Sequence, residues 1–129
     1  KATRAVAHAG VELAKTSNAV RLVVATEHGN APRLVAGHQP GIPITAVSDR
    51  IRAARRVQLL PGVDSIIIKE HQRGSDTMQA AVSALLADGR LNLGDRVVAI
   101  SGSPLAMRGV TSTIRMYRIA NDGTILGAE

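Results

Sequence analysis

Apolar residues recur along the chain at two different spacings, which predicts an alternation of helices and strands. Between residues 3 and 16, Val6, Ala9, Gly10 and Leu13 follow one another at helical spacing. The run RLVVA at 21–25 is short, rich in valine and bounded by polar residues, which is typical of a buried strand. The other predicted strands cover 42–47, 63–68, 94–100 and 112–119, and the other predicted helices cover 32–38, 50–60 and the segment from a cap at Ser75 to a C-cap at Gly89.

This order of elements predicts one α/β domain over residues 1–129. Because strands and helices alternate, we expect three layers: a mostly parallel five-stranded sheet with helices on both faces. No helix fits between residues 100 and 112, so the last strand is expected to return antiparallel to its neighbour. Residues 112–119 alternate between apolar and polar, as a half-exposed edge strand does. A turn is expected at 121–123, and the tail beyond it is expected to fray.

The composition restricts the possible core and the possible partners. Tyr117 is the only aromatic residue, so the core must consist of valine, isoleucine, leucine and alanine. Single-stranded nucleic acid is bound by stacking on aromatic rings, and this composition argues against such a partner. The absence of cysteine excludes disulfides, thiolate metal sites and a cysteine nucleophile. It is compatible with a reducing cytosol, and we expect a cytoplasmic protein.

The net charge of +6 is carried mostly by arginine and does not by itself identify a partner. Arg50, Arg52, Arg55 and Arg56 could grip a nucleic-acid backbone, but at helical spacing they do not form one narrow stripe. A solvated helix face, or a salt-bridged interface with other subunits, is the better interpretation, so no nucleic-acid partner is expected. No apolar run approaches the roughly 20 residues that cross a bilayer, so no membrane partner is expected either.

Two polar loops that follow predicted strands are the candidate binding sites. In open α/β sheets, ligands bind outside the carboxyl ends of the strands. In the first loop, 26–30, backbone N–H groups, the start of the next helix and the Thr26 hydroxyl could face an anion. The second loop, 101–113, carries Arg108 and several hydroxyl residues, and its length favours a function. The alternative for each loop is a plain connection, in which Gly29 only supplies an unusual φ.

Signatures of catalysis and of metal binding are absent from the sequence. There is no Walker motif and no GxGxxG, and the SGS at 101–103 lacks the flanking glycines of a nucleophile elbow. The histidines at 8, 28, 38 and 71 show no ligand spacing with one another or with carboxylates. We therefore predict no catalytic residue, no metal site and no cofactor in this chain.

Taken in order, several segments resemble the C-terminal domain of pyruvate kinase. They are AVAHAGVELAKTSNAVRLVVATEHGNAPRLVAGHQPGIPITAVS, ARRVQLLPGVDSIIIKE, LGDRVVAISGSP and GVTSTIRMYRI. The resemblance implies a helix-flanked sheet with an antiparallel last strand and no catalytic residue. It implies a parent enzyme that transfers a phosphoryl group from phosphoenolpyruvate to ADP, with Mg²⁺ and K⁺ in a catalytic barrel upstream. It also implies a homo-oligomer, since in this family the C-terminal domain serves tetramer assembly.

Many members of this family bind a sugar phosphate or a nucleotide as an allosteric effector between two loops of this domain. Those loops match residues 26–31 and the loop that ends at 109–111. The resemblance therefore implies an effector site formed by Thr26, His28, Gly29, Asn30, Arg108, Gly109 and Thr111.

The first loop departs from the pattern of the family. Thr26, Gly29 and Arg33 match it, but position 30 is not a cation, position 31 has no hydroxyl, and Glu27 adds a negative charge. In the second loop, Val110 stands where a hydroxyl residue is usual. A phosphate bound here would lose about two charge-assisted hydrogen bonds, each worth roughly 1.5–3 kcal/mol.

These departures leave three alternatives open for the site. The effector differs, or Arg108 and His28 supply the missing charge, or the site has lapsed. For the whole chain, the first residue is lysine and not methionine, which suggests a piece of a longer protein. The alternative to a pyruvate kinase domain is a free-standing small-molecule-binding module of the same fold.

Overall fold

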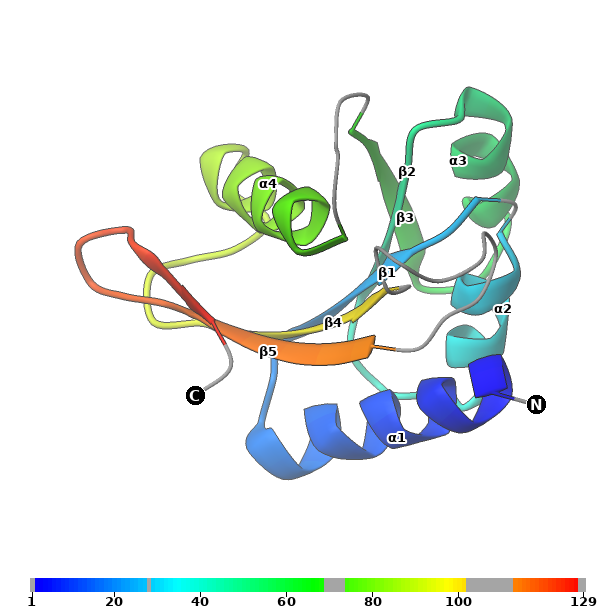
Figure 1. Ribbon diagram of the computed structural model, residues 1–129, viewed down its shortest axis with the longest axis horizontal. Coiled ribbons are helices and arrows are strands. Elements are labelled where there is room, and N and C mark those ends of the chain that lie inside the picture. Colours follow the sequence, from blue (N-terminus) through cyan, green and yellow to red (C-terminus); the bar gives the residue numbers. More distant parts are fainter. Residues whose placement is uncertain (1, 28, 69–73, 102–112, 128–129) are drawn as a thin grey trace.

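The protein was analysed as a computed structural model that describes residues 2–27, 29–68, 74–101 and 113–127. Within these ranges a six-stranded sheet has the strand order β3-β2-β1-β4-β5-β6 (Figure 1). The first four strands are parallel, β5 runs antiparallel to β4, and β6 runs antiparallel to β5. The strands are β1 Arg21–Ala25, β2 Ile44–Ser48, β3 Val63–Ile67, β4 Arg96–Ser101, β5 Thr113–Ile119 and β6 Ile125–Gly127.

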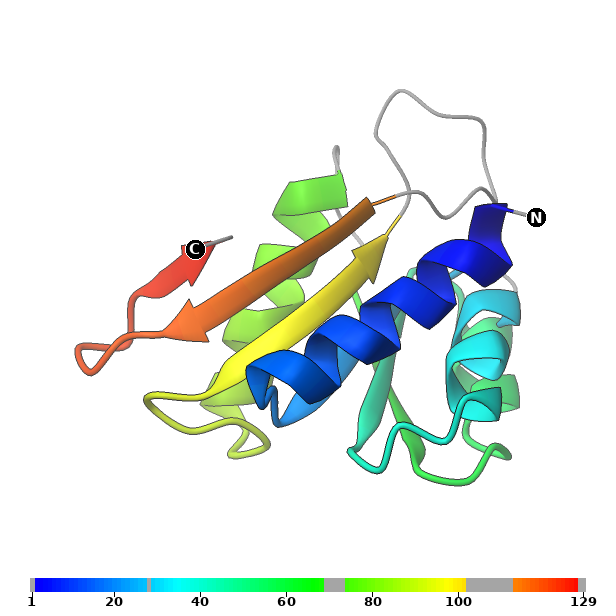
Figure 2. The same cartoon turned by 90° about the horizontal axis from the view of Figure 1, so that it is seen from below.

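Helices cover both faces of the sheet, as the alternation of elements predicts. The helices are α1 Ala2–Ser17, α2 Asn30–Gly37, α3 Ile51–Val57 and α4 Gly74–Ala87. Figure 1 shows α4 on one face and α1 on the other, and Figure 2 shows α1 running across β4. Buried residues of α1, α2 and α3 belong to one apolar cluster, while those of α4 belong to a second. The three-layer α/β fold predicted from the sequence is therefore confirmed.

The central strand β1 shows why the sequence produces two cores. Leu22 and Val24 face the layer of α1, α2 and α3, while Val23 faces α4, and all three are fully buried. A parallel strand covered on both faces needs apolar residues in succession, and LVV at 22–24 supplies them. The apolar stripe of α4 completes the second core, since Met78, Val82 and Leu85 are also fully buried.

The sheet has one strand more than the five predicted, because the tail beyond residue 123 folds back as β6 instead of fraying. A tight turn reverses the chain: the Ala120 N–H donates to the Thr124 carbonyl at 2.8 Å, and Gly123 has a φ of 88°. The Thr124 N–H also donates to the Asp122 carboxylate at 2.9 Å, and this bond lowers the pKa of Asp122. As a result β5 is an edge strand only over the residues before Tyr117, where its pairing with β6 begins.

Two helices differ from the prediction at their ends. The helix predicted for 32–38 begins at Asn30, so Pro32 is its third residue, a place where a missing N–H costs nothing. The helix predicted for 50–60 ends at Val57. Leu59 and Leu60 follow as turns, with N–H groups that donate to the Arg56 and Val57 carbonyls at 3.2 and 3.0 Å, and Pro61 has no N–H with which to continue a helix. No helix within the described ranges is long and apolar enough to cross a membrane.

Candidate functional site

The candidate site lies at the carboxyl edge of the sheet, where β1 and β4 end side by side. The two strands are parallel neighbours, with Val24 opposite Ile100 near their carboxyl ends. Both candidate loops, 26–30 and 101–113, therefore leave the sheet at the same edge from adjacent strands. The first loop is also tied to the next strand along, since the Thr26 N–H donates to the Val47 carbonyl at 2.9 Å.

The turn after β1 is closed by a side chain and requires a glycine. The Gly29 N–H donates to the Thr26 hydroxyl oxygen at 2.7 Å. Gly29 then caps α2 with a φ of 98°, in the left-handed region that residues with a side chain rarely adopt. A Cβ at this position would lie 3.2 Å from Val57 Cγ1 and 3.9 Å from Arg56 Cδ on α3. Gly29 is therefore required both by its backbone geometry and by the close approach of α3.

The beginning of α2 has the elements of a small anion site. The first N–H groups of a helix have no partner within it and carry the positive end of the helix dipole. No acidic residue occupies the first turn, and Gly29 provides no side-chain cap. Arg33 stands one turn on, exposed, and donates to the Asn30 side-chain oxygen at 2.7 Å. The N–H groups without a partner inside the helix are those of Asn30 and Ala31, because Pro32 has no N–H and the Arg33 N–H donates to the Gly29 carbonyl at 3.3 Å. Two amides beside a guanidinium favour a compact anion such as a phosphate.

The structure brings part of the predicted effector site together. Thr26, Gly29 and Asn30 lie in one turn. The predicted residues His28, Arg108, Gly109 and Thr111 lie outside the described residues. The sequence reasoning missed the contact of the turn with α3, because it joins residues 28 positions apart through tertiary packing.

Other charged and polar side chains of the helices on this face are the arginines of α3 and a histidine pair on α1 and α2. Arg52 and Arg55 are exposed, as a solvated helix face requires. His8 on α1 and His38 at the end of α2 lie with ring centroids 5.3 Å apart, a pair that sequence spacing gave no reason to expect. Among the described residues no group of three or more histidine and acidic side chains could hold a metal ion.

A polar network joins three strands on the α4 face and lies nearer the other edge of the sheet. The Arg21 guanidinium donates to the Thr45 hydroxyl at 2.8 Å and to the Asp64 carboxylate at 3.2 Å. Thr45, which is fully buried, donates to the same carboxylate at 2.6 Å. Arg90 and Asp88 are hydrogen-bonded to each other, and these bonds raise the pKa of Arg90 and lower the pKa of Asp88. This network fixes β1, β2 and β3 to one another.

Comparison with known proteins identifies the family. The sequence model described as "Pyruvate kinase, alpha/beta domain" matches residues 4–117. Pyruvate kinase 2 of Synechocystis sp. is 30% identical over 112 residues, which cover 87% of this chain and 19% of the relative. The pyruvate kinase of Staphylococcus epidermidis is 27% identical over 117 residues, with 88% and 20% covered. The chain thus spans about a fifth of the length of the curated relatives that it matches. These matches agree with the α/β fold, and the chain therefore belongs to the pyruvate kinase family as its C-terminal α/β domain.

Proposed function

We propose that this chain is the regulatory and assembly domain of a pyruvate kinase. The parent enzyme transfers a phosphoryl group from phosphoenolpyruvate to ADP, while this domain binds a phosphorylated small molecule at the carboxyl edge of its sheet and catalyses nothing itself. The observation that carries the proposal is the adjacency of β1 and β4, whose carboxyl ends release both candidate loops at one edge. The family match supports the parent activity.

The geometry of the first loop supports a phosphate group as the part of the effector that is held there. The phosphate would lie against the N–H groups at the start of α2, with Arg33 beside it. Thr26 accepts the Gly29 N–H, so its hydroxyl retains a proton that it can donate. The Asn30 side-chain oxygen accepts a hydrogen bond from Arg33, and Asn30 adds no charge. This set of donors suits one phosphate better than two, so weak or absent binding of fructose 1,6-bisphosphate is expected.

The catalytic part of the proposal is tested with the 129-residue chain itself. Phosphoenolpyruvate, ADP, Mg²⁺ and K⁺ are added, and pyruvate is measured by coupling to lactate dehydrogenase. We expect no pyruvate above the background without protein. Turnover that scales with the concentration of the chain would contradict a domain without chemistry of its own.

The effector part is tested by thermal unfolding with fructose 1,6-bisphosphate, ribose 5-phosphate and AMP. A monophosphate is expected to raise the unfolding temperature, and Thr26→Ala is expected to remove that increase. Thr16→Ala, an exposed threonine on α1, is the matched control and should respond as the parent chain does. If no ligand gives a shift that depends on Thr26, the loop is a plain connection. A large shift with the bisphosphate would show that the loop holds two phosphates after all.

The assembly part rests on membership of the family and is tested by light scattering of the purified chain. A homo-oligomer is expected, because the C-terminal domains of this family serve tetramer assembly. The length of the native reading frame separates this proposal from a free-standing binding module. A frame without an upstream catalytic barrel would favour the module.

A further inference from the structure

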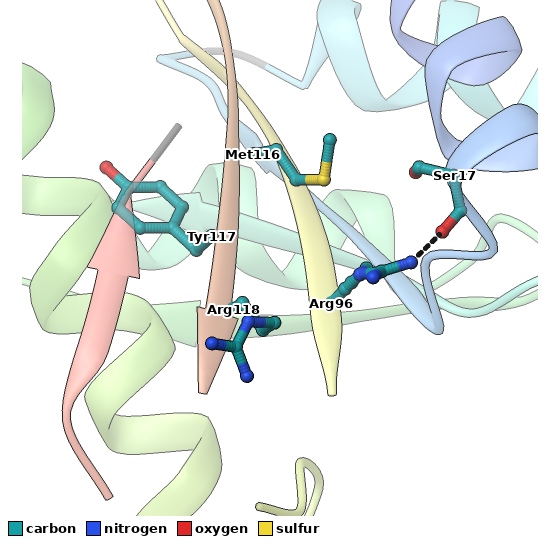
Figure 3. Close-up of a pocket in the computed structure, with 5 residues that line it drawn as sticks. All are labelled: Ser17, Arg96, Met116, Tyr117 and Arg118. Atoms are coloured by element: carbon teal, nitrogen blue, oxygen red, sulfur yellow. Dashed lines mark hydrogen bonds between the residues drawn. The ribbon is translucent and has the colours of Figure 1, made fainter. Parts of the chain in front are cut away.

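A small pocket lies at the amino end of β4, away from the candidate effector site. Its volume is about 170 Å³, and it opens between the C-terminal end of α1 and the strands β4 and β5. Figure 3 shows Arg96 and Met116 directed toward the side where Ser17 lies, while Tyr117 points to the other face of the sheet. The pocket is lined by Ser17, Arg96, Met116, Tyr117 and Arg118. We call it the Arg96–Arg118 pocket.

The two arginines that name the pocket stand directly opposite each other on neighbouring strands. Arg96 pairs with Arg118 in the antiparallel register of β4 and β5. One step along, the Ile119 N–H donates to the Asp95 carbonyl at 2.9 Å, and the Arg96 carbonyl is turned the other way, toward Val20. The arginine pair is therefore of the non-hydrogen-bonded kind, in which the opposite Cα atoms come closest, while Figure 3 shows the Arg96 guanidinium directed toward Ser17 and the Arg118 guanidinium directed away from it. Like charges placed in this way repel each other and destabilise a sheet.

Nothing in the described part of the chain neutralises this pair. Arg96 donates to the Ser17 carbonyl at 3.2 Å, which satisfies the C-terminal end of α1 but supplies no full negative charge. Arg118 is half-buried, and its side chain makes no hydrogen bond or ion pair with the described residues. The nearest acid in sequence, Asp95, accepts the Asn92 N–H at 2.8 Å and stabilises the turn before β4.

Among the residues that the structure describes, the other arginines that are partly or fully buried do have carboxylate partners. Arg21 lies 3.2 Å from the Asp64 carboxylate, and Arg90 lies 2.7 Å from the carboxylate of Asp88. Burying part of a charge without a partner is costly, and the chain avoids that cost at both positions. Arg118 departs from this pattern, and it does so beside a second cation and an open pocket.

We propose that the Arg96–Arg118 pocket binds a compact oxyanion, a phosphate or the phosphate group of a small monoester. Each guanidinium has five N–H donors in a planar fork that matches a phosphate, and only one donor of Arg96 is engaged in the structure. A phosphate carries about −1.5 to −2 charges at pH 7, enough to remove the repulsion between the two arginines. The carbonyls at the end of α1 oppose an anion, and the bond from Arg96 to Ser17 offsets them.

Arg118 is the residue to change, because Arg118→Gln breaks no hydrogen bond or ion pair within the described structure, whereas a change at Arg96 would also remove the bond to α1. The ¹⁵N-labelled chain is titrated with inorganic phosphate and, at matched ionic strength, with sodium chloride. The backbone and side-chain N–H signals of Arg96 and Arg118 are followed by NMR. We expect saturable shifts with phosphate only, and at least about a tenfold loss of affinity in Arg118→Gln.

Arg33→Gln is the control that separates this pocket from the proposed effector site at the other edge of the sheet. It should leave the affinity measured at Arg96 and Arg118 unchanged. Without phosphate and at low salt, Arg118→Gln should be at least as stable as the parent chain, because a like-charge pair is removed. Shifts that chloride reproduces, or phosphate affinity that survives Arg118→Gln, would overturn the proposal. If phosphate moves only the signals of residues 26–33, the effector site stands and this pocket does not.

Discussion

Replacing Gly29 by alanine tests the geometry of the candidate loop most directly. Gly29 has a φ of 98°, and an L-residue in the left-handed region costs about 1–2 kcal/mol. The new Cβ would also lie 3.2 Å from Val57 Cγ1, closer than the roughly 3.5–4.0 Å that two carbon atoms prefer. Relieving that contact adds about 1 kcal/mol, the lower end of what overpacking costs. We therefore expect Gly29→Ala to lower the free energy of unfolding by about 2–3 kcal/mol.

Gly41→Ala is the matched control for the backbone part of this cost. Gly41 has a φ of 80°, and a Cβ there would meet no atom within 4 Å. Its substitution should therefore cost only the conformational part, about 1–2 kcal/mol. The difference between the two variants measures the contact of the loop with α3. Val57→Ala removes the offending methyl group, so Gly29→Ala in that background should cost no more than Gly41→Ala does.

Urea unfolding followed by circular dichroism measures the parent chain and the four variants on one scale. The reasoning is refuted if Gly29→Ala and Gly41→Ala cost the same, because α3 would then not restrict the loop. It is equally refuted if the costs of Gly29→Ala and Val57→Ala simply add, since residues in contact are expected to couple. If Gly29→Ala costs more than Gly41→Ala, the packing of α3 restricts the loop at which a ligand would bind.

Three further changes test the core, the polar network and the acid stability. Gly10→Ala places a Cβ against the Ile100 Cδ1 methyl group and should cost about 1–3 kcal/mol in urea unfolding; Ile100→Val removes that methyl group and should recover most of this loss, and additive costs would contradict the packing. Thr45→Val removes a buried hydroxyl that joins an arginine and an aspartate and should cost about 1–3 kcal/mol, whereas Thr45→Ser keeps the hydroxyl and should cost about 0.8 kcal/mol; an unchanged stability of Thr45→Val would show that the hydroxyl contributes nothing. The hydrogen bonds from Arg90 lower the pKa of Asp88 below its ordinary 3.8, so its stabilising effect is present above that pH and is lost as the pH falls through the lower folded value. Asp88→Asn should therefore flatten the decrease of the unfolding free energy below about pH 4, and an unchanged profile would contradict the shift.

Local patterns predict most of this fold because each one is reinforced by its neighbours in sequence. The strand at 21–25 was predicted with the bounds that the structure has, since a buried valine-rich run between polar turns has few alternatives. The tail was not predicted as a strand, because β6 has three residues and is held by pairing with Tyr117, Arg118 and Ile119 of β5. Such a short strand has no pattern of its own and exists only because its partner is in place.

The candidate site also has one part that the sequence predicts locally and one part that depends on tertiary packing. Thr26, Gly29 and Asn30 could be placed from the sequence, because the end of a strand and a glycine fix a turn locally. The approach of Val57 to that turn could not, since it depends on how α3 packs. The second loop stays a prediction beyond Ser101. The pairing of Arg96 with Arg118 could not be predicted either, because it depends on the register in which β4 and β5 align.

The distribution of charge favours small anionic ligands over a polymeric one. A protein that tracks a nucleic-acid backbone gathers its lysines and arginines along one face. Here Arg33 lies beside the carboxyl edge of the sheet, while Arg96 begins β4 at the opposite end and faces Arg118. Cations separated in this way do not follow one extended phosphate backbone. Each of the two proposed positions has donors for a single phosphate. The proposed site at Arg33 and the proposed pocket at Arg96 and Arg118 lie at opposite ends of the sheet, which is why the two arginine variants are expected to fail independently.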